Sequence, residues 1–446
     1  MTKSLLDGAD LKLGLFSANC SSGMAVTTIE DRWQATWDDN LRLAELADRV
    51  GIDFMLPIAR WIGYGGSTNF HEGVLDPIAL AAALLARTER IFVFATIHTA
   101  FNHPLVSAKA MATVDQVGKG RAGLNIVAGW NKPEYDAMGV DLPQDHDDRY
   151  AYAQEWWEIV RRLWTEPGRY DVDGRFWHLK GAESMQKPYD GLLPILNAGS
   201  STQGRDFAAR NSNVVFTVVG GPEDGAGVVE TVKKNARRTY DREVGVFTPS
   251  YCVCRPTTDE AEEFHRWYAE EHADWDAVDN LMRLQGLHSQ SFTPEMLAMF
   301  RGRFAGGHGV CPLIGTPADV AGEIKRFHDA GFDGMTLSFV DYVDELEYFA
   351  QEVLPRLEAL GVRRPRQSRG GLPVRHACLT PGASGGRPSG GSTEPVPELR
   401  GSARDADDKR AAAGAAREVD RPAPGLEADR AVARPDRGDS FPAQEP

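Results

Sequence analysis

Apolar residues along this chain follow two spacings, one typical of helices and one typical of buried strands. Trp37–Val50 carries its apolar residues at helical spacing, and Gly51 follows it as a C-cap. Ile91–Thr99 and Ala122–Trp130 are instead short, almost continuous apolar runs, as expected for strands that are buried on both faces. The pattern therefore predicts alternating strands and helices rather than a helical bundle or an all-β protein.

The same pattern recurs along the first 360 residues. The predicted strands are Lys12–Ala18, Asp53–Ala59, Ile91–Thr99, Ala122–Trp130, Pro194–Gly199, Val214–Val219, Val244–Val253 and Gly334–Val340. The predicted helices are Trp37–Val50, Pro77–Arg90, Pro104–Val117, Arg149–Thr165, Thr202–Asn211, Glu223–Arg242, Thr258–Gln285, Pro317–Ala330 and Glu345–Leu360. Such alternation implies a parallel sheet and an α/β fold.

About eight strand–helix units of this length predict a closed (β/α)8 TIM barrel with insertions. A doubly wound open sheet is the main alternative, but no G-x-G-x-x-G follows the first strand. Two stretches, Arg60–Val74 and His272–Pro312, are too long for simple connections. The second contains Gly306–Gly309, and we expect it to form a lid over the catalytic face.

Composition changes sharply near residue 363. Beyond it the chain is dominated by Arg, Pro, Gly, Ala, Ser and acidic residues, and Phe441 is its one aromatic residue. Such a segment cannot bury enough apolar surface to offset the entropy of ordering. We therefore predict a barrel domain at 1–363 and a disordered low-complexity tail at 364–446, with an interaction role for the tail as the alternative.

Charge and composition narrow the function. A net charge of −15 argues against a nucleic acid or an anionic membrane surface as partner. The start of the chain has no signal-peptide pattern, and no apolar run is long enough to span a membrane. The five cysteines form no spaced framework, and Cys252 and Cys254 fit two buried thiols on one strand face. These features predict a cytoplasmic protein.

In a TIM barrel the chemistry sits at the carboxyl ends of the strands. The polar residues there include Arg60, Thr96, His98 and Asn125. Arg60 could pair with an anion, or it could form a surface salt bridge. Asn125 could bind a ligand or be a structural amide, and the same alternatives hold for Thr96. His98 is a candidate general base or hydrogen-bond donor, although a lone histidine there is often structural.

Ser200 and Ser201 begin a predicted helix after the fifth strand. Their hydroxyls and the free backbone N–H groups would suit a phosphate, although a plain N-cap gives the same sequence. No H-E-x-x-H or C-x-x-C pattern points to a metal, and no G-x-S-x-G or P-loop motif is present. His265 and His272 flank an acidic helical stretch, which we interpret as a solvated face.

The stretch Thr113–Gly139 resembles the bacterial luciferase-like flavin monooxygenases. The residues that carry the resemblance are Gly120-Arg121, Gly129-Trp130, Glu134 and Tyr135. Further motifs resemble the pyrimidine, sulfone and alkanesulfonate monooxygenases of that family: Ser21–Met24, Gly63–Gly66, Arg149-Tyr150, Ala198–Ser201 and Ile314–Pro317. The resemblance covers about residues 11–362 and implies the same TIM-barrel fold.

The resemblance also implies site residues. Those that would hold the flavin are Ala59, Arg60, Asn125, Glu134, Arg149, Tyr150 and Ser201, with Ser200 beside them. Those implied for catalysis are Arg60, Thr96 and Asn125, and His98 joins them as a proton donor or acceptor. The chain departs from the pyrimidine enzymes at three positions: Arg60 replaces a Lys, Ala59 a larger aliphatic residue, and His98 a small residue.

The activity implied is a two-component monooxygenase. It would take FMN as FMNH2 from a separate NAD(P)H:flavin reductase, use O2, and oxygenate a small organosulfur or N-heterocyclic substrate through a flavin peroxide, as in alkanesulfonate catabolism. A homodimer or homotetramer is usual in such enzymes. An F420-dependent oxidoreductase of the same superfamily is the alternative, and a non-catalytic flavin-binding protein is a second one.

Overall fold

The computed structural model describes residues 5, 6, 8, 10–143, 145–199, 201–287 and 293–365. These residues belong to the first of two compact units, Met1–Pro381. Ser200 and the predicted tail beyond Pro365 lie outside the described residues. No helix within the described ranges is both long enough and apolar enough to cross a membrane.

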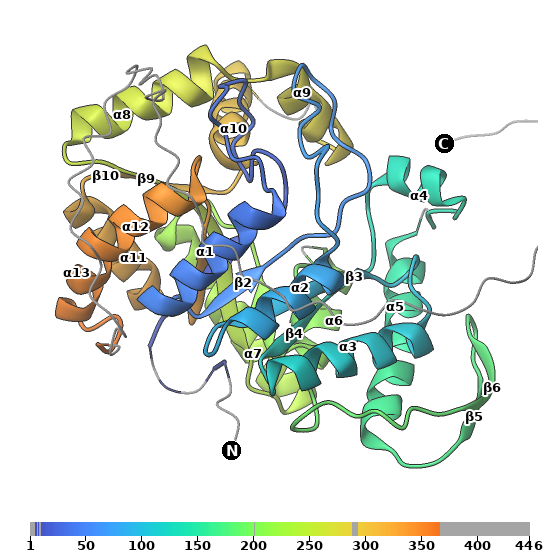
Figure 1. Ribbon diagram of the computed structural model, residues 1–446. Helices are drawn as coiled ribbons and strands as arrows, with labels where there is room; N and C mark the ends of the chain where they lie inside the picture. The colour runs from blue at the N-terminus through green and yellow to red at the C-terminus, as the bar shows by residue number, and fades with distance from the viewer. Residues whose placement is uncertain are drawn as a thin grey trace, which may run out of the picture. The chain divides into compact units, whose positions relative to one another are not determined.

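Eight parallel strands close into a barrel, which confirms the predicted TIM fold (Figure 1). Around the ring they are β1 (Lys12–Phe16), β2 (Phe54–Leu56), β3 (Phe92–His98), β4 (Ala122–Val127), β7 (Ile195–Asn197), β8 (Val214–Phe216), β9 (Gly245–Cys254) and β11 (Gly334–Leu337). The open-sheet alternative is wrong, because β8 pairs with β9 and β11 pairs with β1, so the ring has no free edge.

Helices cover the outside of the barrel. They are α1 (Trp37–Val50), α2 (Pro77–Arg87), α3 (Pro104–Gly118), α5 (His146–Thr165), α6 (Thr202–Asn211), α7 (Pro222–Tyr240), α11 (Pro317–Asp329), α12 (Tyr342–Glu352) and α13 (Leu354–Ala359). Local sequence sets their ends: Thr36 and Asp39 form a capping box at the start of α1, and Gly51 ends it at a φ of 91°. The predicted bounds of α1 and α6 are confirmed to the residue.

Other elements are insertions between the barrel units. They are α4 (Lys132–Met138), the hairpin β5 (Tyr170–Asp173) and β6 (His178–Ala182), α8 (Thr258–Arg266), the π-helix η1 (Trp267–Glu271), α9 (Trp275–Leu284), α10 (Pro294–Gly307) and β10 (Cys311–Gly315). The helices α8, α9 and α10 lie together at one end of the barrel (Figure 1). Strand β10 pairs with the second half of β9, outside the ring.

The stretch His272–Pro312, which we expected to form a lid, contains two helices instead. Helix α9 lies within the predicted helix Thr258–Gln285, whereas α10 was not predicted. The reason is that α10 contains several glycines, and glycine is a poor helix former. Gly307 is nevertheless required there, because a Cβ at this position would come within 2.2 Å of the Tyr251 ring. The predicted lid sequence thus forms the last turn of a packed helix, and His308 caps it at a φ of 56°. His265 and His272 are also half-buried rather than solvated, and His265 Nε2 lies 3.1 Å from the Tyr251 hydroxyl.

Phenylalanine rings fill the lower half of the barrel interior. Phe54, Phe94 and Phe247 belong to one buried cluster, in which the ring centroids of Phe54 and Phe94 are 5.8 Å apart. Glycines on neighbouring strands make room for them, since a Cβ at Gly123 would lie 2.4 Å from Phe94. Polar side chains on the same interior face must therefore sit above this plug, toward the carboxyl ends of the strands.

A second core lies between the strands and the surrounding helices. Cys252 and Cys254 both belong to it, and neither forms a disulfide. The prediction that these two are buried thiols is confirmed. Burial raises the pKa of Cys254 to about 12 and that of Cys252 well above its usual range, so both stay protonated and unreactive at neutral pH.

A buried ion pair fixes the end of the barrel chain to its beginning. Arg363 Nη1 lies 2.8 Å from Asp53 Oδ2, with the two side chains 6% and 4% exposed. The same arginine donates to the Gly51 carbonyl, and Asp53 accepts from the Leu13 amide. Residues at the start of β1 and β2 are thereby joined to the last residues of the barrel unit.

We expect Arg363→Ala to lower the free energy of unfolding by about 3–5 kcal/mol, because it leaves a buried carboxylate without its cation. Urea denaturation followed by circular dichroism measures the change. Arg364→Ala is the matched control, because the arginine side chain is 73% exposed and its partner Asp10 is only half-buried. That variant should lose about 0–1 kcal/mol. Equal losses in the two variants would contradict the role given to Arg363.

Candidate functional site

Strand β3 presents a ladder of side chains into the barrel. Phe92, Phe94, Thr96 and His98 alternate along it and so share its interior face. The two phenylalanines belong to the plug, which leaves Thr96 and His98 at the carboxyl end. This is the end at which TIM-barrel enzymes carry their chemistry.

Asn125 lies directly opposite Thr96 on β4. Its amide donates to Thr96 Oγ1 at 3.0 Å, and Thr96 Oγ1 donates to the Pro57 carbonyl at 2.6 Å. The carbonyl oxygen of the Asn125 amide is buried and accepts no hydrogen bond from the described residues. The amide nitrogen is therefore used by the fold, whereas the amide oxygen is available to a ligand.

Arg60 forms a buried ion pair. It follows β2, and its Nη1 lies 2.8 Å from Glu134 Oε1 on α4, with side-chain exposures of 6% and 1%. The same carboxylate oxygen accepts the Trp61 amide at 3.0 Å. The alternative that Arg60 makes a surface salt bridge is wrong. Burial alone would lower the pKa of Arg60, but Tyr64 and Glu134 outweigh it and raise this pKa, so the guanidinium keeps its charge.

Two aromatic rings flank this guanidinium. The Arg60 Cζ lies 5.0 Å from the centroid of Tyr64 and 5.3 Å from that of Trp130. The rings are inclined by only 16° to each other. Both contacts lie within the range of cation–π attraction and restrict the arginine side chain to one position.

His98 is buried beneath two other aromatic side chains. Its ring lies 5.2 Å from that of Trp61 and 5.4 Å from that of Phe101. Burial and the charge of Arg60 lower the pKa of His98 to about 3. The imidazole is therefore neutral at physiological pH, and its Nδ1 has no partner among the described residues. As a neutral ring it can accept or donate one proton, but it carries no resident positive charge.

Buried polar atoms without a partner gather around this ion pair. Within the described chain they are Arg60 Nε, Tyr64 Oη, His71 Nδ1, His98 Nδ1, Asn125 Oδ1, Asn131 Oδ1 and Glu134 Oε2. Buried polar groups are nearly always hydrogen-bonded in folded proteins, so such a concentration indicates a bound polar ligand. Sequence reasoning missed His71 and Asn131 and placed Tyr64 only within a glycine-rich motif. Their positions within irregular segments gave no strand-end signal.

A second group of predicted residues meets at the start of α6. Ser201 caps this helix, and its hydroxyl accepts the Gly204 amide at 3.1 Å. The Tyr150 side chain, near the start of α5, hydrogen-bonds to Ser201. A Cβ at Gly199 would lie 2.7 Å from the Tyr150 hydroxyl, so glycine is required for this close approach. The N-cap geometry is confirmed, and the remaining N–H groups of the first turn stay open to an anion.

The two remaining predicted residues lie beside these groups. Ala59 is buried next to Arg60. Arg149 adjoins Tyr150 on α5, and its Nε lies 2.5 Å from the Pro143 carbonyl oxygen. The structure thus divides the predicted residues into two sets, one on the Arg60–Glu134 ion pair and one at the α6 N-terminus.

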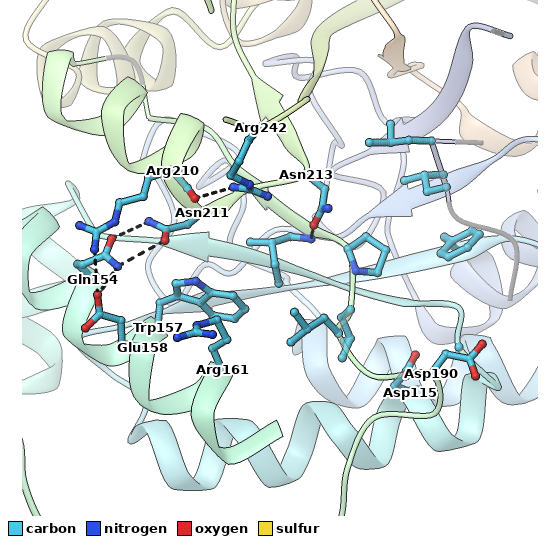
Figure 2. A pocket seen from close by; sticks show the side chains of 18 residues that line it. Asp115, Gln154, Trp157, Glu158, Arg161, Asp190, Arg210, Asn211, Asn213 and Arg242 are labelled. Carbon is cyan, nitrogen blue, oxygen red and sulfur yellow. Dashed lines mark hydrogen bonds and ion pairs between the residues drawn. The ribbon is translucent and has the colours of Figure 1, made fainter. Parts of the chain in front are cut away.

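A cavity of about 770 Å3 lies at the opposite end of the barrel (Figure 2). Its polar side chains satisfy one another: Gln154 and Asn211 exchange hydrogen bonds, and Arg210 pairs with Glu158 at 3.3 Å. No described side chain that lines it has a buried polar atom without a partner. Size alone therefore does not locate the chemistry, and the carboxyl end of the barrel remains the candidate site.

Comparison with known proteins agrees with this geometry. The family model described as luciferase-like monooxygenase matches residues 11–334. The chain belongs to the luciferase-like monooxygenase family. It is therefore an enzyme, a flavin-dependent monooxygenase, as the resemblance of the Thr113–Gly139 stretch implied.

Two curated members of this family cover most of the chain. The FMNH2-dependent dimethylsulfone monooxygenase of Pseudomonas fluorescens is 30% identical over 360 residues, 78% of this chain and 95% of that protein. The pyrimidine monooxygenase RutA of Enterobacter sp. is 28% identical over 354 residues, 78% of this chain and 96% of that protein. The expected use of FMN and O2 is confirmed by this family membership, since the first of these relatives is an FMNH2-dependent monooxygenase.

The family fold is also seen in solved structures. DmoA from Hyphomicrobium sulfonivorans superimposes with a TM-score of 0.71 at 20% identity, covering 81% of this chain and 90% of that one. At this identity the likeness supports the barrel fold and nothing finer.

The buried histidine of this luciferase-like site predicts an acid-sensitive fold. In the folded state the pKa of His98 is about 3, below its ordinary value of 6.5. Between these pH values the unfolded chain binds a proton that the folded chain cannot bind, so stability falls as pH falls, by about 1.4 kcal/mol per pH unit. We expect His98→Gln to make the free energy of unfolding less pH-dependent, by about 2 kcal/mol between pH 6.5 and 5. Urea unfolding at a series of pH values measures both slopes, and parallel slopes would contradict a neutral, buried His98.

Proposed function

We propose that this protein is a two-component monooxygenase that takes FMNH2 from a separate NAD(P)H:flavin reductase and uses O2 to oxygenate a small organosulfur or N-heterocyclic compound. The observation that carries the proposal is the concentration of unpartnered buried polar atoms around Arg60 and Glu134. A helix N-terminus with an open anion site lies at the same end of the barrel.

The chain's residues suit FMN. The isoalloxazine has polar ring atoms that need donors and acceptors, and Asn125, Arg60 and Glu134 each offer a buried atom without a partner. Ala59 supplies a small buried surface beside them. Ser201 and Tyr150 would hold the phosphate at the start of α6, with Arg149 on the neighbouring turn and Ser200 in the same predicted cap. When bound, reduced FMN supplies the electrons that activate O2.

The chain's own residues then have separate roles. Asn125 and Thr96 form one hydrogen-bonded pair, which would position oxygen beside the flavin. Arg60 keeps its positive charge and would stabilise negative charge that develops in the reaction. Neutral His98 would hold or accept a proton at Nδ1.

Aromatic side chains exclude water from this chemistry. Trp61, Phe101 and Tyr135 pack in sequence beside His98, with centroid separations of 5.1 Å and 4.7 Å. Tyr64 and Trp130 cover the Arg60 guanidinium. Water exclusion protects reactive oxygen species from unproductive decay.

An F420-dependent hydride transfer at the same site is the alternative. A cytoplasmic location, a homodimer or homotetramer, and a role in alkanesulfonate catabolism stay predictions. The named relatives favour oxygenation, because both are monooxygenases and together they cover most of the chain.

The decisive experiment is anaerobic titration with FMNH2, followed by mixing with O2 and observation of the flavin absorbance. We expect saturable binding of FMNH2, reoxidation that differs in rate from that of free FMNH2, and a rate that changes when substrate is present. Absence of FMNH2 binding, together with binding of F420, would establish hydride transfer instead. O2 consumption that no tested substrate alters would contradict the proposed oxygenation.

Two buried asparagines on adjacent strands provide a matched test of the flavin site. Asn125→Leu should weaken FMNH2 binding about tenfold, because one ligand hydrogen bond is lost, and should leave stability within about 1 kcal/mol. Asn197 instead donates to Ile126 O and accepts from Gly199 N, so both halves of its amide are used by the fold. Asn197→Leu should lower stability by about 1–3 kcal/mol. Unchanged FMNH2 affinity in Asn125→Leu would remove Asn125 from the flavin site.

We further propose that residues 1–363 form the monooxygenase domain and that residues 364–446 have no catalytic role. A chain ending at Pro365 keeps the Arg363–Asp53 and Arg364–Asp10 ion pairs. We expect it to match the full chain in thermal midpoint, FMNH2 affinity and oligomer size by light scattering. A smaller oligomer, or a loss of flavin affinity, would assign the tail an assembly role.

A further inference from the structure

A cluster of aromatic side chains lies near Arg60 and is not part of the proposed flavin site. It consists of Tyr64, Phe70, His71 and His308, which we call the imidazole wall. The rings of Tyr64 and His71 are 5.7 Å apart, those of His71 and His308 are 5.9 Å apart, and Phe70 stacks on His71 at 3.9 Å. The wall joins the loop after β2 to the end of α10.

Two atoms of this wall are buried and have no partner within the described chain. They are the Tyr64 hydroxyl and His71 Nδ1, on side chains that are 0% and 1% exposed. The proposed flavin set does not include them. His71 Nε2 lies 2.5 Å from the Gly23 carbonyl oxygen and must be the protonated nitrogen. Nδ1 is consequently a bare acceptor, and the neighbouring hydroxyl can donate or accept.

The imidazole wall carries no net charge. Burial and the neighbouring His308 hold the pKa of His71 well below its usual value, and burial with Arg60 lowers the pKa of His308 to about 3. Among the described residues, the charged side chains that act on Tyr64, His71 and His308 are Arg60 and Glu134. These two already neutralise each other at 2.8 Å.

Resting on the proposed function, we propose that the imidazole wall selects an uncharged substrate that bears a carbonyl or sulfonyl oxygen, and that it excludes anions such as sulfonates and carboxylates. The Tyr64 hydroxyl can donate to such an oxygen, and the aromatic rings can cover an apolar body. An anion would find a cation that is already paired. It would also lie near Glu134, whose carboxylate is buried and cannot be screened by water.

Pairs of similar compounds, in which a methyl group of the neutral member is replaced by an anionic group, test this substrate class. Three pairs are dimethyl sulfone with methanesulfonate, methyl phenyl sulfone with benzenesulfonate, and 6-methyluracil with orotate. Calorimetric binding to the FMN-loaded protein, and substrate-dependent O2 uptake with FMNH2, are measured for each compound. We expect the uncharged member to bind at least tenfold more tightly in one pair or more, and no anion to bind better than its neutral partner.

Equal affinities, a preference for the anions, or no binding by any uncharged member would overturn the proposal. Loading with FMN is measured first and separately. A protein that binds no flavin would refute the monooxygenase function, whereas a flavin-loaded protein that prefers anions would refute the substrate class alone.

His308 offers a matched pair of variants. It is half-buried and already has a positive φ, so His308→Arg and His308→Gln carry similar backbone strain. The arginine adds a cation to the wall and should shift the ratio of anion to neutral affinity about tenfold to a hundredfold toward the anion. The glutamine should leave the ratio unchanged. Equal ratios in the two variants would show that the wall does not contact the substrate and would overturn its role.

Discussion

The buried ion pair between Arg60 and Glu134 is the interaction on which the carboxyl end of this barrel depends. Both charges are withdrawn from water, so neither residue can be lost without leaving the other uncompensated. The carboxylate also holds the Trp61 amide, and the guanidinium lies against Tyr64 and Trp130. One pair thereby fixes the loop after β2, the short helix α4 and the aromatic lining between them.

The barrel interior divides along its axis into a structural half and a chemical half. The two-residue period of a strand places Phe92, Phe94, Thr96 and His98 on one line, and the change from apolar to polar along that line marks the boundary. The buried phenylalanines close the barrel below the polar half and leave it apolar on that side. The phenylalanine side chains offer no hydrogen-bond partners to the polar side chains above them. Several buried polar atoms at this end of the barrel therefore have no partner among the described residues and are available to a ligand.

Local signals in the sequence predicted the barrel well. Capping residues and helical periodicity located α1 and α6 to the residue, because both depend on neighbours in the chain. Arg60, Thr96 and Asn125 could be proposed from their positions at strand ends. Glu134 came only from family resemblance, since its pairing with Arg60 joins residues 74 positions apart. Helix α10 was missed because its glycines serve contacts with Tyr251, and no local pattern records such a contact.

The Arg363–Asp53 ion pair also decides where the described chain leaves the barrel. Asp53 stands just before β2, and the Leu11 amide, just before β1, donates to the Val362 carbonyl, so the last described residues lie at the amino ends of the strands. The proposed flavin and substrate site is at the other end. Any domain fused after Pro365 would therefore start at the amino ends of the strands and would not cover the proposed site at their carboxyl ends. Attachment to a solid surface through this end would therefore leave the proposed site accessible. A flavin reductase fused at this end would still have to release reduced flavin into solution before the proposed site could bind it.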